Sequence, residues 1–133
     1  MNLRTTATIY LLEPDAGTTK TIRSLCAEKA LSLHCFQSDD ELMKAMEFTQ
    51  PSCVIVAMDK PMRGALYLLT SLITRGGQVP VIMLGLHSDI ASAVKAIRAG
   101  AIDYIEKPTI YGRLAEHLNN IIKYSSSTPA SVV

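Results

Sequence analysis

Three cysteines and three histidines are the residues of this sequence best suited to bind a metal ion or to form a covalent bond. Cys26, Cys35 and Cys53 are widely spaced and include no Cys-x-x-Cys pair, and the histidines are equally scattered. Because these spacings match neither a zinc site nor a disulfide framework, we predict buried structural thiols and no bound metal. Gly-x-Gly-x-x-Gly, the Walker loop and Gly-x-Ser-x-Gly are also missing from the sequence.

Short apolar runs alternate with longer stretches of helical periodicity along the chain. The apolar runs cover residues 8–12, 31–36, 53–58, 80–86 and 102–105. Three of these runs are nearly continuous in Val, Ile, Leu and Met, which is typical of strands covered on both faces. The helical stretches cover residues 16–30, 38–46, 64–75, 89–99 and 110–123. The alternation predicts an α/β fold, a three-layer flavodoxin-like (βα)5 domain whose five-stranded parallel sheet has the order 2-1-3-4-5.

Two of the expected helices carry start signals in the sequence. Ser38 and Glu41 have the spacing of a capping box, and Asp89 is expected to begin the fourth helix. The apolar residues of that fourth helix, at positions 90, 94 and 97, are predicted to face inward. In a parallel sheet of this kind the functional crevice lies beyond the carboxyl ends of the strands. The positions of interest are therefore 13–15, 57–63, 85–88 and 107–108.

The composition favours one folded domain. Of 133 residues, 48% are hydrophobic and 19% are charged, which suits a buried core and excludes disorder. The net charge of +1 provides no general attraction to nucleic acid or to an anionic membrane. The N-terminal residues lack a signal-peptide core, so we expect a cytoplasmic protein without membrane contact. We place the domain over residues 7–123 and interpret residues 124–133 as a linker or disordered tail.

Four segments near the expected strand ends carry a resemblance to a known family. Residues 9–15 read Ile-Tyr-Leu-Leu-Glu-Pro-Asp, residues 53–57 read Cys-Val-Ile-Val-Ala, and residues 80–84 read Pro-Val-Ile-Met-Leu. The most specific segment, residues 93–108, holds Ala-Gly-Ala, an aromatic residue and Glu-Lys-Pro. The chain thus resembles a CheY-like response-regulator receiver domain, nearest to the FixJ-type branch. This resemblance implies phosphorelay signal transduction in a two-component system and a cis peptide bond before Pro108.

Receivers accept a phosphoryl group from a histidine kinase on an aspartate that ends the third strand. An acidic pair holds Mg²⁺ beside it, and a hydroxyl and a lysine bind the phosphoryl oxygens. Mapped onto this sequence, the nucleophile position holds Ala57, the acidic pair is Glu13 and Pro14, and the hydroxyl position holds Gly85. Lys107 alone keeps the family's residue. The resemblance therefore implies a degenerate phosphorylation site with no catalytic residues, weak or absent Mg²⁺ binding and no other cofactor.

Several residues near this site leave alternatives open. Lys107 is either a relic or the partner of Glu13. Asp59 is either an ordinary loop residue or a displaced acceptor, which would make the protein a phosphorylatable response regulator. Asp15 either caps the first helix or shifts the acidic pair by one position. His87 is either a loop residue beside a helix start or a pH sensor or phosphoryl acceptor.

The degenerate site leads us to expect an atypical pseudo-receiver, a regulatory and interaction module that is not an enzyme. Control would come from a partner protein, a small molecule or constitutive dimerisation, and such domains often precede the DNA-binding part of a transcriptional regulator. We expect the protein partner or second copy at the face of helix 4, strand 5 and helix 5. Its expected contacts are Ala91, Lys95, Ala99 and Tyr104, with the tyrosine as an aromatic anchor. Direct nucleic-acid binding by this domain is not expected.

Overall fold

The computed structural model describes residues 7–58, 62–75, 77–86 and 89–131, with only the backbone of residues 62–63 and 124–131. Its five parallel strands form one sheet with the order β2-β1-β3-β4-β5, as the sequence predicts. The strands are β1 (Thr8–Leu12), β2 (Ser32–Cys35), β3 (Cys53–Ala57), β4 (Val81–Leu86) and β5 (Asp103–Lys107). The helices are α1 (Ala16–Glu28), α2 (Asp39–Phe48), α3 (Met62–Arg75), α4 (Ile90–Arg98) and α5 (Tyr111–Ser131).

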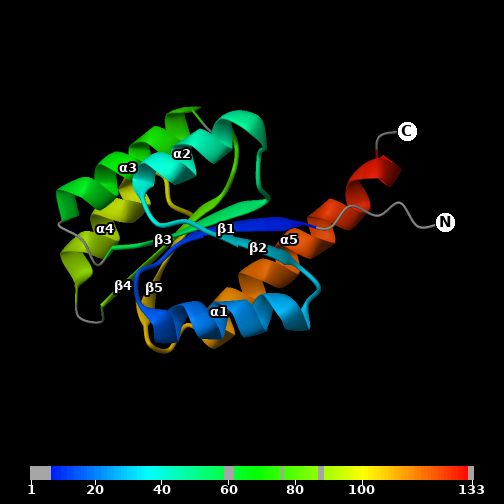
Figure 1. The fold of residues 1–133 in the computed structure, drawn as a ribbon, viewed down its shortest axis with the longest axis horizontal. Coiled ribbons are helices and arrows are strands. Elements are labelled where there is room, and N and C mark those ends of the chain that lie inside the picture. The colour runs from blue at the N-terminus through cyan, green and yellow to red at the C-terminus, as the bar shows by residue number, and fades with distance from the viewer. Residues whose placement is uncertain (1–6, 59–61, 76, 87–88, 132–133) are drawn as a thin grey trace.

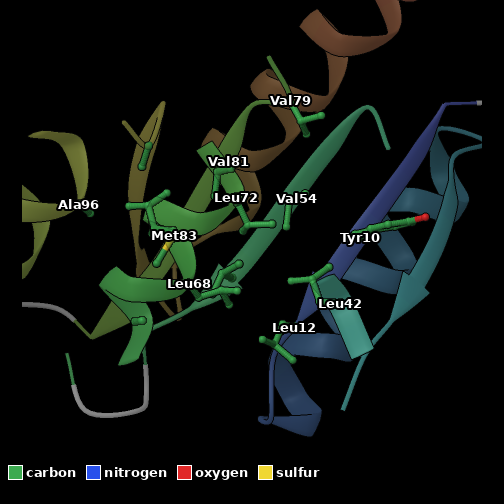
Figure 2. Packing of buried hydrophobic residues seen from close by; sticks show 14 of the residues in the cluster. Tyr10, Leu12, Leu42, Val54, Leu68, Leu72, Val79, Val81, Met83 and Ala96 are labelled. Carbon is green, nitrogen blue, oxygen red and sulfur yellow. The ribbon is translucent and has the colours of Figure 1, made fainter. Parts of the chain in front are cut away.

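The sheet is the middle of three layers (Figure 1). Helices α1 and α5 cover one face, and α2, α3 and α4 cover the other. Every residue of β3 is buried, because this central strand is covered on both faces. Its alternate side chains belong to two separate apolar cores, with Val54 and Val56 under α2 and α3, and Ile55 under α1 and α5. Figure 2 shows the core on the α2–α3–α4 side.

The helix starts follow the signals in the sequence. The side chain of Asp15 accepts a hydrogen bond of 2.8 Å from the Thr18 N–H, so it caps α1. Ser38 Oγ accepts a bond of 3.2 Å from the Glu41 N–H, whereas the Glu41 carboxylate reaches back to the N–H of Gln37 at 2.8 Å. The capping box therefore forms, with its return bond one residue earlier than the usual pattern. Both helix starts are fixed by side chains of the loops that precede them.

Helix α4 presents a different face to the core from the one predicted. Ser92 and Ala96 are buried, whereas Ile90, Val94 and Ile97 are 74%, 44% and 47% exposed. The prediction that these three apolar residues face inward was wrong. The side of α4 that faces the core therefore carries small side chains, which permit close packing between layers. The result is a row of exposed apolar side chains along α4.

Helix α5 is attached to β5 by polar contacts and runs further than predicted. The carboxylate of Asp103 accepts hydrogen bonds from Arg113 and, at 2.7 Å, from His117. Partial burial acts to raise the pKa of Asp103, but the hydrogen bonds from His117 and Arg113 outweigh this effect and the pKa is lowered.

Helix α5 continues to Ser131, whereas the predicted helix ends at residue 123. No glycine or proline lies between residues 113 and 128 to interrupt it. The interpretation of residues 124–133 as a linker or disordered tail stays a prediction.

Candidate functional site

The parallel strands bring the predicted site residues to one edge of the sheet. Glu13 directly follows β1, Ala57 ends β3, Gly85 lies in β4 and Lys107 ends β5. The register pairs Ala57 with Leu84 and Gly85 with Glu106, so these positions lie at similar heights along the sheet. The peptide bond between Lys107 and Pro108 is cis, as predicted.

An ion pair joins the two charged residues of this edge. Lys107 Nζ lies 3.1 Å from Glu13 Oε1 and 3.3 Å from Glu13 Oε2. The Glu13 side chain is fully buried, and that of Lys107 is 9% exposed. Glu13 Oε2 also accepts a hydrogen bond of 2.9 Å from the Asp15 N–H. Of the two alternatives for Lys107, the structure therefore shows the one in which it pairs with Glu13.

The pair crosses the ends of two intervening strands. The sheet order places β3 and β4 between β1 and β5, so the contact between Glu13 and Lys107 spans the ends of the two strands that hold Ala57 and Gly85. Neither of these small residues offers a side-chain oxygen. The lysine that would bind a phosphoryl group in a competent receiver is thus neutralised by a carboxylate from β1. This arrangement provides buried charge compensation, and the two described residues beneath the pair provide no nucleophilic oxygen.

Gly85 packs closely against the ring of Tyr104, a contact that the sequence analysis does not predict. A Cβ atom added there would lie 1.8 Å from the hydroxyl oxygen of Tyr104 and 2.4 Å from its Cζ. The tyrosine ring therefore occupies the space that a side chain at position 85 would need. The signal that points to this contact is a glycine inside a strand, which often marks close approach by another group.

The predicted interaction face is only partly on the surface. Ala91 and Lys95 are exposed and Ala99 is half-buried. Tyr104 is 7% exposed and packs in the core on the α2–α3–α4 side. The prediction that this tyrosine provides a surface anchor was therefore wrong, because its ring fills the gap beside Gly85. Asp59 and His87, the two other candidates for phosphoryl chemistry, lie outside the described residues.

The sequence matches the family model for the response regulator receiver domain over residues 9–119. The chain belongs to this receiver family. The response regulator protein TodT of Pseudomonas putida is 34% identical over 100 residues, which cover 75% of this chain and 44% of TodT. The DNA-binding transcriptional regulator NtrC of Klebsiella pneumoniae is 28% identical over 99 residues, 74% of this chain and 21% of NtrC. The chain thus spans less than half the length of these curated relatives.

Solved receiver structures agree with the fold. The receiver protein from Pseudoalteromonas atlantica superposes with a TM-score of 0.76 at 30% identity, over 87% of this chain and 97% of that one. A response regulator from Thermotoga maritima gives a TM-score of 0.80 at 19% identity, over 90% of this chain and 99% of that one, and shows the fold alone. The expected family and fold class are therefore confirmed. Within the described residues, no helix has both the length and the apolar character needed to cross a bilayer.

The described residues do not fit the Mg²⁺ ion that belongs to phosphoryl transfer in receivers. Mg²⁺ needs several oxygen ligands in near-octahedral geometry. Here the Glu13 carboxylate is bound by the ammonium of Lys107, the next position is Pro14, and Ala57 offers no oxygen. In the described part of the chain, no three His, Cys, Asp or Glu residues gather where they could hold a metal ion.

Removing the cation of the buried pair should destabilise the domain. We expect Lys107→Met to lower the free energy of unfolding by about 3 kcal/mol, because the buried Glu13 carboxylate loses its partner. The double variant Glu13→Gln/Lys107→Met should recover much of this loss, since it leaves no uncompensated charge. Urea unfolding at pH 7 measures both, with Lys44→Met on the exposed side of α2 as the control. A loss below about 1 kcal/mol for Lys107→Met would mean that the pair behaves as an exposed one.

A methyl group at position 85 should displace the ring of Tyr104. We expect Gly85→Ala to cost about 1–3 kcal/mol of unfolding free energy, as overpacking of a core does, and to change the tyrosine signal in near-ultraviolet circular dichroism. In a Tyr104→Leu background the same substitution should cost much less, because leucine lacks the atoms that would clash. Gly112→Ala is the matched control, since a Cβ there meets no atom within 4 Å. Equal costs of Gly85→Ala in both backgrounds would refute the contact.

Proposed function

We propose that this receiver domain acts without phosphorylation, as a regulatory and protein-interaction module rather than an enzyme. The observation that carries the proposal is the Glu13–Lys107 ion pair across Ala57. A phosphoryl acceptor needs a nucleophilic oxygen, an oriented cation and hydrogen-bond donors for the developing charge. The nucleophile position lacks the oxygen, and the remaining cation is held by the remaining acid.

The proposal extends to the cellular compartment and to the kind of protein that contains this domain. We place it in the cytoplasm, as the receiver part of a two-component-type transcriptional regulator, and the DNA-binding relative NtrC supports this choice. The domain itself would contact protein and not nucleic acid or membrane, because its net charge of +1 offers no basic surface field. Regulation would then depend on what binds the domain.

The exposed row of α4 supports a protein partner at the α4–β5–α5 face. Ile90, Val94 and Ile97 follow the i, i+4, i+7 spacing of one helix face and are at least 44% exposed. Lys95 and Arg98 add positive charge beside this row. We propose a second copy of the chain as the partner, because two-fold dimers are the commonest homo-oligomers and the same apolar row would face itself across the two-fold axis.

Mass spectrometry after treatment with acetyl phosphate and Mg²⁺ tests the loss of phosphorylation. We expect the wild-type chain to keep its mass and Ala57→Asp to be phosphorylated only poorly. The new carboxylate would still lack an acid at Pro14 and a hydroxyl at Gly85, and Lys107 is engaged by Glu13. A phosphorylatable receiver treated in parallel is the positive control. Rapid phosphorylation of the wild type, for example at Asp59, would overturn the proposal, and near-stoichiometric modification of Ala57→Asp would show that the missing groups matter little.

Sedimentation at increasing protein concentration tests the partner face. We expect Val94→Glu and Ile97→Glu to weaken self-association by about tenfold or more, because each places a charge in an apolar contact. Phe48→Glu is the matched control, since Phe48 is 85% exposed at the end of α2 on another part of the surface. Equal effects of all three variants, or a chain that stays monomeric, would refute self-association through α4.

A further inference from the structure

A cavity of about 530 Å³ opens at the carboxyl edge of the sheet. Its described lining comes from the ends of β1, β2 and β3 and from α1, α2 and α3. It therefore lies beside the Glu13–Lys107 pair, on the side towards β2. Pockets that hold small organic molecules usually measure about 300–1,000 Å³. Helices α1 and α3 leave β1 and β3 towards opposite faces (Figure 1), and ligands of open α/β sheets bind at this kind of position.

The floor and walls of the cavity are largely apolar. Leu12, Val56 and Ala57 line it from the strand ends, with Leu68 from α3 and Phe36 after β2. Figure 2 shows Leu12 and Leu68 on the same side of the sheet. With alanine at position 57, the strand end contributes a methyl group where a carboxylate would make the floor polar and negative. An apolar or aromatic molecular body thus fits these walls, and the Phe36 ring provides an aromatic surface for it.

The charged groups of the lining favour an anion. Lys20 and Arg23 lie three residues apart on α1, which places them on one face of the helix. Arg23 Nη2 donates a long hydrogen bond of 3.5 Å to the Cys35 sulfur, a weak acceptor, and Lys20 has no ion pair with the described residues. Of the two acids in the described part of the lining, Glu13 is ion-paired with Lys107, and Asp39 lies in the first turn of α2. The helix N-terminus stabilises that second charge.

We propose that this cavity binds a small organic anion with a flat apolar body, of the aromatic carboxylate class. The body contacts Leu12, Ala57 and Phe36, and the carboxylate meets the guanidinium of Arg23 and the ammonium of Lys20. One carboxylate suits this pair better than a doubly charged phosphate, because Asp39 offsets part of the positive charge. The inference rests on the proposed loss of phosphoryl chemistry, since an acceptor carboxylate at position 57 would line the same cavity.

Titration with 1-naphthoate and with its neutral analogue 1-naphthamide tests the site. We expect saturable one-to-one binding of naphthoate, followed by amide chemical shifts of lining residues, and at least about tenfold weaker binding of naphthamide. Lys20→Met and Arg23→Met should each lower the affinity for naphthoate by a similar factor and leave the affinity for naphthamide unchanged. Lys123→Met, which lies on α5 away from the lining, is the control. Equal affinity for the two probes, or no saturation at millimolar concentration, would overturn the proposal.

Filling the cavity provides a test that does not depend on charge. Gly64 lines the cavity on α3, and a Cβ atom added there meets no other atom within 4 Å. Gly64→Leu should therefore keep the fold, since leucine has a higher helix propensity than glycine. It should lower the affinity for naphthoate at least about tenfold. Gly112→Leu, at an equally open helical glycine outside the lining, is the matched control. Unchanged binding by Gly64→Leu would show that naphthoate binds elsewhere and would overturn the assignment.

The cysteines provide a second readout of the same site. Cys26 and Cys53 are buried as predicted, and burial raises the pKa of Cys26 to about 11 and that of Cys53 to about 12. The prediction of a buried thiol was wrong for Cys35, which is exposed and lines the cavity. Iodoacetamide should thus alkylate Cys35 selectively, and naphthoate should slow this reaction. An unchanged rate of Cys35 alkylation at saturating naphthoate would contradict the proposed site.

The failure of this inference can be distinguished from the failure of the proposed function. If acetyl phosphate modifies the wild-type chain, the proposed function fails. If the chain stays unmodified but binds no naphthoate, only this inference fails.

Discussion

The buried contact between Glu13 and Lys107 is the interaction on which the carboxyl edge of the sheet depends. It joins the first and last strands across the two that lie between them, and both of its side chains are almost entirely shielded from water. Withdrawing either charge from water alone is costly, so each group is tolerable only because the other is present. The pair therefore fixes the loop after β1 and the end of β5 in one mutual arrangement. It also holds the Lys107 ammonium against the Glu13 carboxylate.

The small residues beneath the pair are part of the same arrangement. A carboxylate at Ala57 would compete with Glu13 for the lysine, and a side chain at Gly85 would collide with the ring of Tyr104. The departures from the receiver pattern at Ala57 and Gly85 thus lie at the ends of two paired strands. The carboxyl edge of the sheet thus combines a buried ion pair with a largely apolar cavity towards β2.

The sequence predicted the order of the strands, the caps at Ser38 and Asp89 and the gathering of the site residues, because these follow from local periodicity and from the rules of parallel sheets. It left the cap at Asp15 as one of two alternatives. It did not predict which face of α4 is buried. A helix that carries both large and small apolar residues has two plausible inner faces, and the distance to the layer beneath decides between them. The inward ring of Tyr104 was missed for a related reason. It depends on a space at Gly85 that belongs to a neighbouring strand and is invisible along the chain.

The contact between Gly85 and Tyr104 also constrains how such a domain could evolve. A lineage regaining a hydroxyl at position 85 would first have to move or replace the tyrosine, and either single step disturbs a packed core. Each substitution alone would therefore destabilise the domain, whereas the two together would be tolerated. Positions 85 and 104 are therefore expected to change together and not singly.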